Sequence, residues 1–229
     1  MASSLPCAPL PVPIRAASVA RRIVRTIARM AEPSCSPLAA SRFFVALRPD
    51  VLASGRLGRL AAELGTRCRG RPLAARDLHL TLAFIGELPL AEGDRLVALL
   101  AGLPAKHPGF ALDEIGRFGP ALLWAGPSED PPWIAPLVDA VRERLRAGGV
   151  RFDARAFKSH LTLVRNARDR AAVGTAIAHL DPKRAHPVST WRLAVGGSHP
   201  EPTPERRYLW RRLPDIEAAG TERRHRSVK

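Results

Sequence analysis

Two short stretches of the chain carry residue types that can perform acid–base chemistry. The sequence His79-Leu80-Thr81-Leu82 recurs as His160-Leu161-Thr162-Leu163, and each copy lies inside an apolar run. Successive side chains of a β-strand point to opposite faces, so the histidine and the threonine of each copy share a face. If the two strands lie close together, they gather two imidazoles and two hydroxyls in one cleft. This set of groups is suited to acid–base chemistry on an anion.

Two neighbouring histidines can supply both the acid and the base that such a reaction needs. A free imidazole has a pKa of about 6.5, so near neutrality one ring can be neutral and act as a base while the other is protonated and acts as an acid. Threonine hydroxyls and a guanidinium can donate hydrogen bonds to the oxygens of such an anion as charge develops. The sequence has no carboxylate–histidine cluster with the spacing of a metal site. We therefore expect neither a metal nor a cofactor.

The apolar pattern predicts an α+β fold in two similar halves, each containing one HLTL motif. Internal duplication would explain how one cleft holds two copies of the motif. We expect a bilobal duplicated fold, with two antiparallel sheets facing across a central groove and helices on the outside. Strands are expected at 42–47, 78–85, 110–118, 121–125, 160–164, 190–195 and 208–213, and helices at 50–66 (with Asp50 as N-cap), 89–102, 133–148 and 169–180.

Residues 41–214 form the predicted domain, and the segments on either side of it have a different composition. Residues 1–40 are rich in Pro, Ser and Ala, with an Arg-rich stretch that resembles an organellar transit peptide. An unstructured extension, or an upstream start codon read through to Met30, explains the same segment. The polar residues 215–229 are expected to be a disordered basic tail.

The 229 residues include 36 Lys and Arg against 21 Asp and Glu, a net charge of +15. Such an excess favours binding of polyanions, although a genomic bias toward Arg and Ala would produce it too. The three cysteines, Cys7, Cys35 and Cys68, are unpatterned, which argues against a disulfide framework and a zinc site. No apolar run approaches the roughly 18 residues of a membrane-spanning helix. We expect a cytoplasmic monomer that does not associate with membranes.

The two motifs and their flanks resemble the paired HxTx signatures of the two-histidine (2H) phosphoesterase superfamily. Within it, residues 42–213 are most similar to the RNA 2′,3′-cyclic phosphodiesterases, also called 2′-5′ RNA ligases. The resemblance is carried by the segments 42–47, 77–86, 118–124 and 157–165. A single HxT tripeptide would mean little, but two in β-like runs with these flanks form a specific pattern.

The resemblance implies hydrolysis of a 2′,3′-cyclic phosphate at an RNA end, or of a cyclic nucleotide, to a 2′-phosphomonoester without a metal. It implies that His79 is the proton donor and His160 the proton acceptor. It also implies that Thr81, Thr162 and Arg165 bind the phosphate. These roles are expectations that come from the family and not from spacing alone.

The sequence departs from the family pattern at two places. Ser159 stands where the family usually has Pro before the second histidine. The family's GGxRY-like stretch reads Gly196-Gly197-Ser198-His199 here, with Tyr208 following after a loop, which leaves the contribution of the last hairpin open.

Two further positions leave alternatives open. Arg165 lies five residues after His160, so strict alternation would send its side chain to the opposite face. A bulge or a strand end after Leu163 would redirect it. Phe44 could stack on a nucleobase, as aromatic residues do in readers of single-stranded RNA, or could belong to the core.

Two rivals to the hydrolase interpretation also remain. The same groups, run in reverse, would join a 5′-hydroxyl to a cyclic phosphate as a 2′-5′ RNA ligase. A non-catalytic module that binds RNA ends would use the basic charge without the chemistry, although retention of both HxT motifs favours an enzyme.

Overall fold

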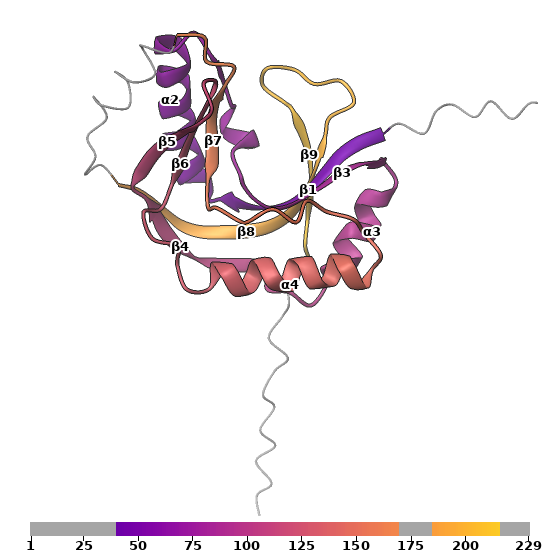
Figure 1. Ribbon diagram of the computed structural model, residues 1–229. Helices are drawn as coiled ribbons and strands as arrows, with labels where there is room; N and C mark the ends of the chain where they lie inside the picture. The colour runs from indigo at the N-terminus through magenta and orange to yellow at the C-terminus, as the bar shows by residue number, and fades with distance from the viewer. Residues whose placement is uncertain (1–39, 170–184, 216–229) are drawn as a thin grey trace, which may run out of the picture. The chain divides into compact units, whose positions relative to one another are not determined.

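The computed structural model describes residues 40–169 and 185–215 (Figure 1). The predicted extension 1–40, the helix at 169–180 and the tail 215–229 lie almost entirely outside the described residues, so they remain predictions. The described strands are β1 (Ala40–Pro49), β2 (Arg71–Pro72), β3 (Leu80–Pro89), β4 (Lys106–Leu112), β5 (Glu114–Phe118), β6 (Leu122–Gly126), β7 (Leu161–Arg165), β8 (His186–Ser198) and β9 (Tyr208–Arg212). The helices are α2 (Val51–Arg67), the 3-10 turn η1 (Ala75–Asp77), α3 (Glu92–Leu99) and α4 (Ile134–Ala147).

The strands pair in the order β4-β8-β1-β3-β7-β6-β5, with β9 added to β8 and β2 to β7, and every pairing is antiparallel. The predicted α+β class is therefore confirmed. Two separate sheets were expected, but hydrogen bonds connect the strands into one sheet. Its two parts join where β3 meets β7, at the pair Leu80 and Leu161. The predicted internal duplication is not tested by this arrangement and stays a prediction.

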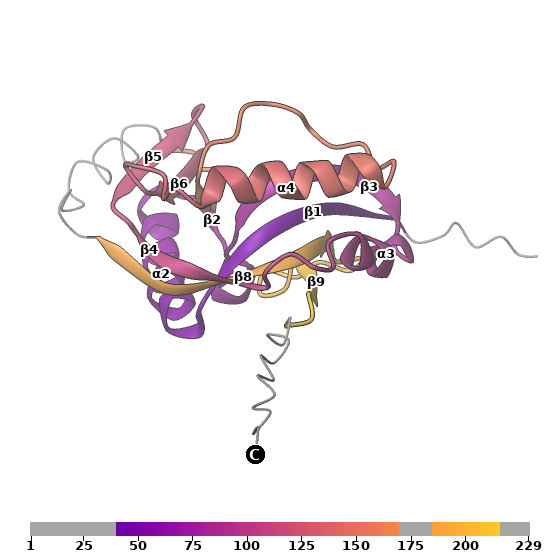
Figure 2. The ribbon, with the colours of Figure 1, turned by 90° about the horizontal axis from the view of Figure 1, so that it is seen from below.

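The helices form where apolar residues recur at helical spacing, and they bury that side. Leu57, Leu60 and Leu64 of α2 are buried, and Asp50 caps the helix by accepting a hydrogen bond from the Ala53 N–H (2.8 Å), as predicted. In α4 the buried residues are Ile134, Leu137, Val138, Val141 and Leu145, which recur at helical spacing within the predicted helix 133–148. Helices α3 and α4 lie along the face of β1 and β8 opposite the β8–β9 hairpin (Figures 1 and 2).

Several predicted boundaries were wrong because tertiary pairing overrides local pattern. Strand β3 runs to Pro89 because β1 pairs with it as far as Ala40, and α3 therefore begins at Glu92. The strand expected at 110–118 is divided at Asp113, whose carboxylate accepts hydrogen bonds from the Ser128 N–H and hydroxyl. Strand β8 begins at His186, ahead of the predicted start, since it pairs with β1, β4 and β9 together.

Candidate active site

His79 lies at the start of β3, directly after the turn η1. Its Nδ1 is 2.6 Å from the carbonyl oxygen of Asp77, two residues earlier, and the side chain is only 6% exposed. A carbonyl oxygen can only accept, so Nδ1 carries a proton and donates it. The reactive nitrogen of His79 is therefore Nε2.

His160 is held by the same local device. Its Nδ1 donates to the carbonyl oxygen of Lys158, again two residues earlier, at 2.8 Å. Leu80 and Leu161, the residues that follow the two histidines, are register partners and are fully buried. The histidines and threonines beside this pair therefore belong to the opposite face of the sheet from the two leucines.

Three aromatic rings surround His79. Phe44 stacks on it, with ring centroids 4.7 Å apart and planes inclined by 23°, while Tyr208 and Trp210 meet it edge-on at 5.1 Å and 5.3 Å. Gly196 is required beneath this cluster, because a Cβ there would collide with the rings of Phe44 and Trp210. The cluster excludes water from the imidazole on every side that it covers.

This burial lowers the pKa of His79 to about 4. Loss of hydration is the largest cause, and the positive charges of Arg165, His160 and Arg48 lower the pKa further. The hydrogen bond to the Asp77 carbonyl acts in the opposite direction, because it favours the protonated ring. His79 is consequently neutral near pH 7 when no anion is bound.

His160 is less enclosed than His79. Phe118, which is 39% exposed, meets its ring edge-on at 4.9 Å. Burial is the main cause that lowers the pKa of His160, and the charges of Lys158 and Arg165 contribute, while the bond to the Lys158 carbonyl raises it. The two histidines are electrically coupled, since the charge of His160 is one of the causes that lower the pKa of His79.

Arg165 lies in the site because β7 contains a bulge, one of the two features that would redirect its side chain. In the pairing of β6 with β7, Leu123 lies opposite Val164 and Trp124 opposite Thr162, so Leu163 is an extra residue. A bulge of this kind shifts the alternation by one position, which places Arg165 on the face of His160 and Thr162. Its charge lowers the pKa of both histidines, and its Nε is buried without a hydrogen-bond partner.

A pocket of about 270 Å³ opens beside His79. It collects four of the predicted site residues: Phe44, His79, Thr81 and Arg165. His160 and Thr162 are not among its lining residues, and Thr162 is 8% exposed. The structure thus places the first motif and Arg165 on one pocket, with the second motif beside it across the Leu80–Leu161 pair.

Phe44 was expected to stack on a nucleobase or to belong to the core. It is 4% exposed, and its ring is covered by His79, Tyr208 and Trp210. Its contact in the structure is therefore with the catalytic candidate itself, and base stacking by Phe44 stays a prediction. Phe84 lines the same pocket and is 43% exposed, so its ring is accessible to a ligand.

The sequence interpretation missed the part that the β8–β9 hairpin plays. This hairpin lines the pocket with Ser198, His199, Pro202, Arg207 and Tyr208. Asp77 connects the hairpin to His79. Its buried carboxylate accepts a hydrogen bond from the Arg207 N–H at 2.8 Å, and its backbone carbonyl accepts one from His79 Nδ1. A basic pair followed by an aromatic residue, Arg206-Arg207-Tyr208, was the available signal.

No group of three or more His, Cys, Asp or Glu side chains in residues 40–169 and 185–215 is arranged to hold a metal ion. No helix in the same part of the chain is both long and apolar enough to cross a membrane.

Comparisons with known proteins find similarity to phosphoesterases in both sequence and fold. Residues 49–127, which include His79 and Thr81, match the family described as LigT like phosphoesterase. The chain is 36% identical over 107 residues to the RNA 2′,3′-cyclic phosphodiesterase of Escherichia coli K12, a match covering 45% of this chain and 60% of that protein. A protein of the same name from Archaeoglobus fulgidus is 26% identical over 140 residues, covering 59% of this chain and 78% of the relative.

Solved structures agree on the fold. E. coli LigT in complex with 3′-AMP has a TM-score of 0.57 and 24% identity, covering 76% of this chain and 96% of that one. The apo form of the same protein has a TM-score of 0.54 and 25% identity, covering 76% and 95%. The chain is thus similar to the LigT-like phosphoesterases over residues 49–127 and shares the fold of the LigT structures. It spans 60% of the length of the E. coli relative and 42% of a Geobacillus stearothermophilus relative.

Proposed function

We propose that this protein hydrolyses 2′,3′-cyclic phosphates at RNA ends, or in cyclic nucleotides, to 2′-phosphomonoesters. The observation that carries the proposal is the matched setting of the two histidines. Each is held through Nδ1 by the carbonyl two residues before it, and the residues that follow them pair with each other. The names of the relatives, RNA 2′,3′-cyclic phosphodiesterase, support the same substrate class.

The reaction needs one base and one acid. His160 Nε2 takes a proton from water as the water oxygen attacks the phosphorus. The bond from phosphorus to O3′ breaks, and His79 Nε2 gives its proton to the leaving O3′. A free 3′-hydroxyl and a 2′-phosphate result, and each group contributes roughly 10²–10⁴-fold to such a rate.

His79 must be protonated before it can act as the acid, although its pKa in the free protein is about 4. A bound phosphodiester carries a negative charge, which favours the imidazolium and raises this pKa. The low dielectric of the aromatic cluster strengthens that attraction. Substrate binding and protonation of His79 are therefore linked, and the acid is charged chiefly when there is a phosphate to act on.

Thr81, Thr162 and Arg165 are the proposed phosphate ligands. The Thr81 side chain and Arg165 line the pocket that contains His79. The buried Arg165 Nε has no partner among the described residues, so it has a hydrogen bond to offer an anion. Charge-assisted bonds from a guanidinium stabilise the phosphoryl oxygens as negative charge accumulates on them.

The test is hydrolysis of an RNA oligonucleotide with a 2′,3′-cyclic phosphate end, measured with and without EDTA. We expect a 2′-phosphate product in both conditions and a loss of at least about 10²-fold in His79→Ala and in His160→Ala. Lys106→Ala, a substitution at an exposed position of β4, is the control, and it should keep the wild-type activity. Full activity in either histidine variant would refute the mechanism, and loss of activity in EDTA would refute metal independence.

A further inference from the structure

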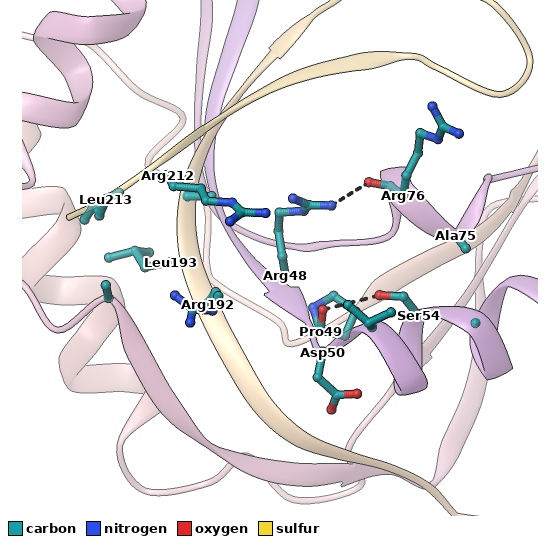
Figure 3. Close-up of a pocket in the computed structure, with 14 residues that line it drawn as sticks. Arg48, Pro49, Asp50, Ser54, Ala75, Arg76, Arg192, Leu193, Arg212 and Leu213 are labelled. Carbon is teal, nitrogen blue, oxygen red and sulfur yellow. Dashed lines mark hydrogen bonds between the residues drawn. The ribbon is translucent and has the colours of Figure 1, made fainter. Parts of the chain in front are cut away.

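A second pocket, of about 640 Å³, contains charges that the proposed chemistry does not use. Four arginines line it: Arg48, Arg76, Arg192 and Arg212 (Figure 3). The carboxylate in its lining belongs to Asp50, and both oxygens of that group already accept backbone N–H groups, from Ala53 and Ser189. In Figure 3 this carboxylate points away from Arg48.

Arg48 and Arg212 form the centre of the pocket. In Figure 3 the Arg212 guanidinium points toward the Arg48 side chain, and the Arg48 Nη2 donates to the carbonyl oxygen of Arg76 at 2.9 Å. The Nε of Arg48 is buried and has no hydrogen-bond partner. Burial and the charge of Arg212 lower the pKa of Arg48, with the carboxylate of Asp77 partly compensating. Among the described residues, neither Arg76 nor Arg212 takes part in an ion pair. Two neighbouring cations of this kind are an arrangement that a bound anion stabilises.

This pocket and the histidine site occupy the same face of the sheet. Phe44 and Arg48 are four residues apart in β1, so their side chains point to the same side and lie about 13 Å apart along the strand. The Arg48 guanidinium lies 4.6 Å above the ring of Trp210, whose centroid is 5.3 Å from that of His79. The strand register places the other arginines on this face as well. Arg48 pairs with Arg192 on β8, and Arg212 of β9 pairs with Ala194, two residues after Arg192.

We propose that the arginine pocket binds a backbone phosphate of the RNA strand whose cyclic end is bound at His79. The inference rests on the proposed function and narrows its substrate to an oligonucleotide. Guanidinium groups bind phosphate through paired hydrogen bonds, and the apolar part of the lining, which includes Val51 and Leu213, offers contact area to a ribose or a base. Trp210 lies between the two sites, because it contacts Arg48 of the arginine pocket and His79.

The first test compares kcat/KM for a 2′,3′-cyclic mononucleotide with that for di-, tri- and tetranucleotides having the same cyclic end. We expect the wild-type value to rise with length, and Arg76→Ala/Arg212→Ala to lower it for the tetranucleotide about tenfold more than for the mononucleotide. Arg151→Ala removes one exposed cation after α4, outside this pocket, and should keep the wild-type length dependence. A length-independent wild type, or a double variant that keeps the preference, would overturn the proposal.

The second test measures binding without catalysis, using a fluorescein-labelled tetranucleotide with a 3′-terminal phosphate at several salt concentrations. Each lost phosphate contact should reduce the slope of log K against log salt by about 0.7. If the enzyme cleaves no cyclic phosphate but the double variant binds the strand more weakly, the proposed function fails while the pocket assignment stands. Equal binding by wild type and double variant refutes the assignment. Saturable AMP binding that needs Arg212, without any effect of strand length, would assign the pocket to a separate nucleotide and also overturn it.

Discussion

Leu80 lies opposite Leu161 where strand β3 meets strand β7, and both side chains are fully buried. This pair is the joint between the two parts of the sheet, and one HxT motif lies on each side of it. Since the leucines anchor the two strands in the core, they also fix the separation of the histidines beside them. The two strands therefore hold the proposed acid, His79, and the proposed base, His160, at a fixed distance from each other.

The pH dependence of kcat/KM should be a bell with its maximum below pH 6.5. Activity requires one protonated and one neutral histidine, and burial lowers the pKa of both rings, that of His79 to about 4. Above the higher pKa the singly protonated enzyme declines about tenfold per pH unit. The measurement is kcat/KM on a cyclic nucleotide from pH 4 to pH 9. A plateau from pH 6 to pH 8 would contradict the lowered values.

The assignment of acid and base can be separated with an activated substrate. A phosphodiester with a p-nitrophenolate leaving group does not need a proton donor, since this anion is stable in water. His79→Ala should therefore lose much less activity on the aryl ester than on the cyclic phosphate, while His160→Ala loses activity on both, by about 10²-fold or more. Equal losses in the two variants on the aryl ester would refute the assignment.

Burial of neutral His79 should make the folded protein less stable in acid. Its pKa is about 4 in the folded state and about 6.5 in the unfolded state, so between these values the unfolded chain binds more protons. Stability is therefore highest above pH 6.5 and falls as the pH decreases toward 4, by up to about 3 kcal/mol from this group.

Urea unfolding at pH 7 and pH 4.5 measures this difference. His79→Phe keeps an aromatic ring among Phe44, Tyr208 and Trp210 but cannot titrate. The variant should lose much of the pH dependence. An unchanged difference between the two pH values would show that other groups cause it.

Asp77 is expected to matter through the hairpin it holds. Asp77→Ala removes the acceptor of the Arg207 N–H, a bond to a charged group worth about 1.5–3 kcal/mol, and frees the β8–β9 hairpin that lines the pocket. KM for a cyclic nucleotide should rise several-fold, with a lower Tm. Asp77→Asn keeps an acceptor oxygen and should restore most of both. If Asn behaves like Ala in KM, the hydrogen bond is not what positions the hairpin.

Strand parity was enough to predict the part of the site nearest the motifs. Alternation placed His79 with Thr81 and His160 with Thr162, and the structure puts the intervening leucines in the core. The position of Arg165 depended on the extra residue Leu163 in β7, which alternation alone can allow but cannot require. A bulge is set by how two strands pair, and pairing is a tertiary property.

The hairpin and the aromatic cluster were beyond local patterns for the same reason. Phe44, Tyr208 and Trp210 are distant in sequence, and they meet because β1 and β9 both pair with β8. In the sequence Gly196 belongs to the stretch compared with the family's GGxRY-like pattern, whereas in the structure it leaves room for the rings of Phe44 and Trp210. No single segment contains that information.

Both imidazoles donate a hydrogen bond through Nδ1 to a backbone carbonyl oxygen, which cannot take up a proton. Neither ring can pass charge to a carboxylate behind it, so in the proposed reaction one turnover exchanges the protonation states of the two rings. His79 ends neutral and His160 ends charged, and this is the starting state for closing or joining a phosphodiester. The arrangement proposed for hydrolysis therefore leaves the two rings, after each product is formed, protonated for the reverse reaction until proton exchange with water restores the starting state.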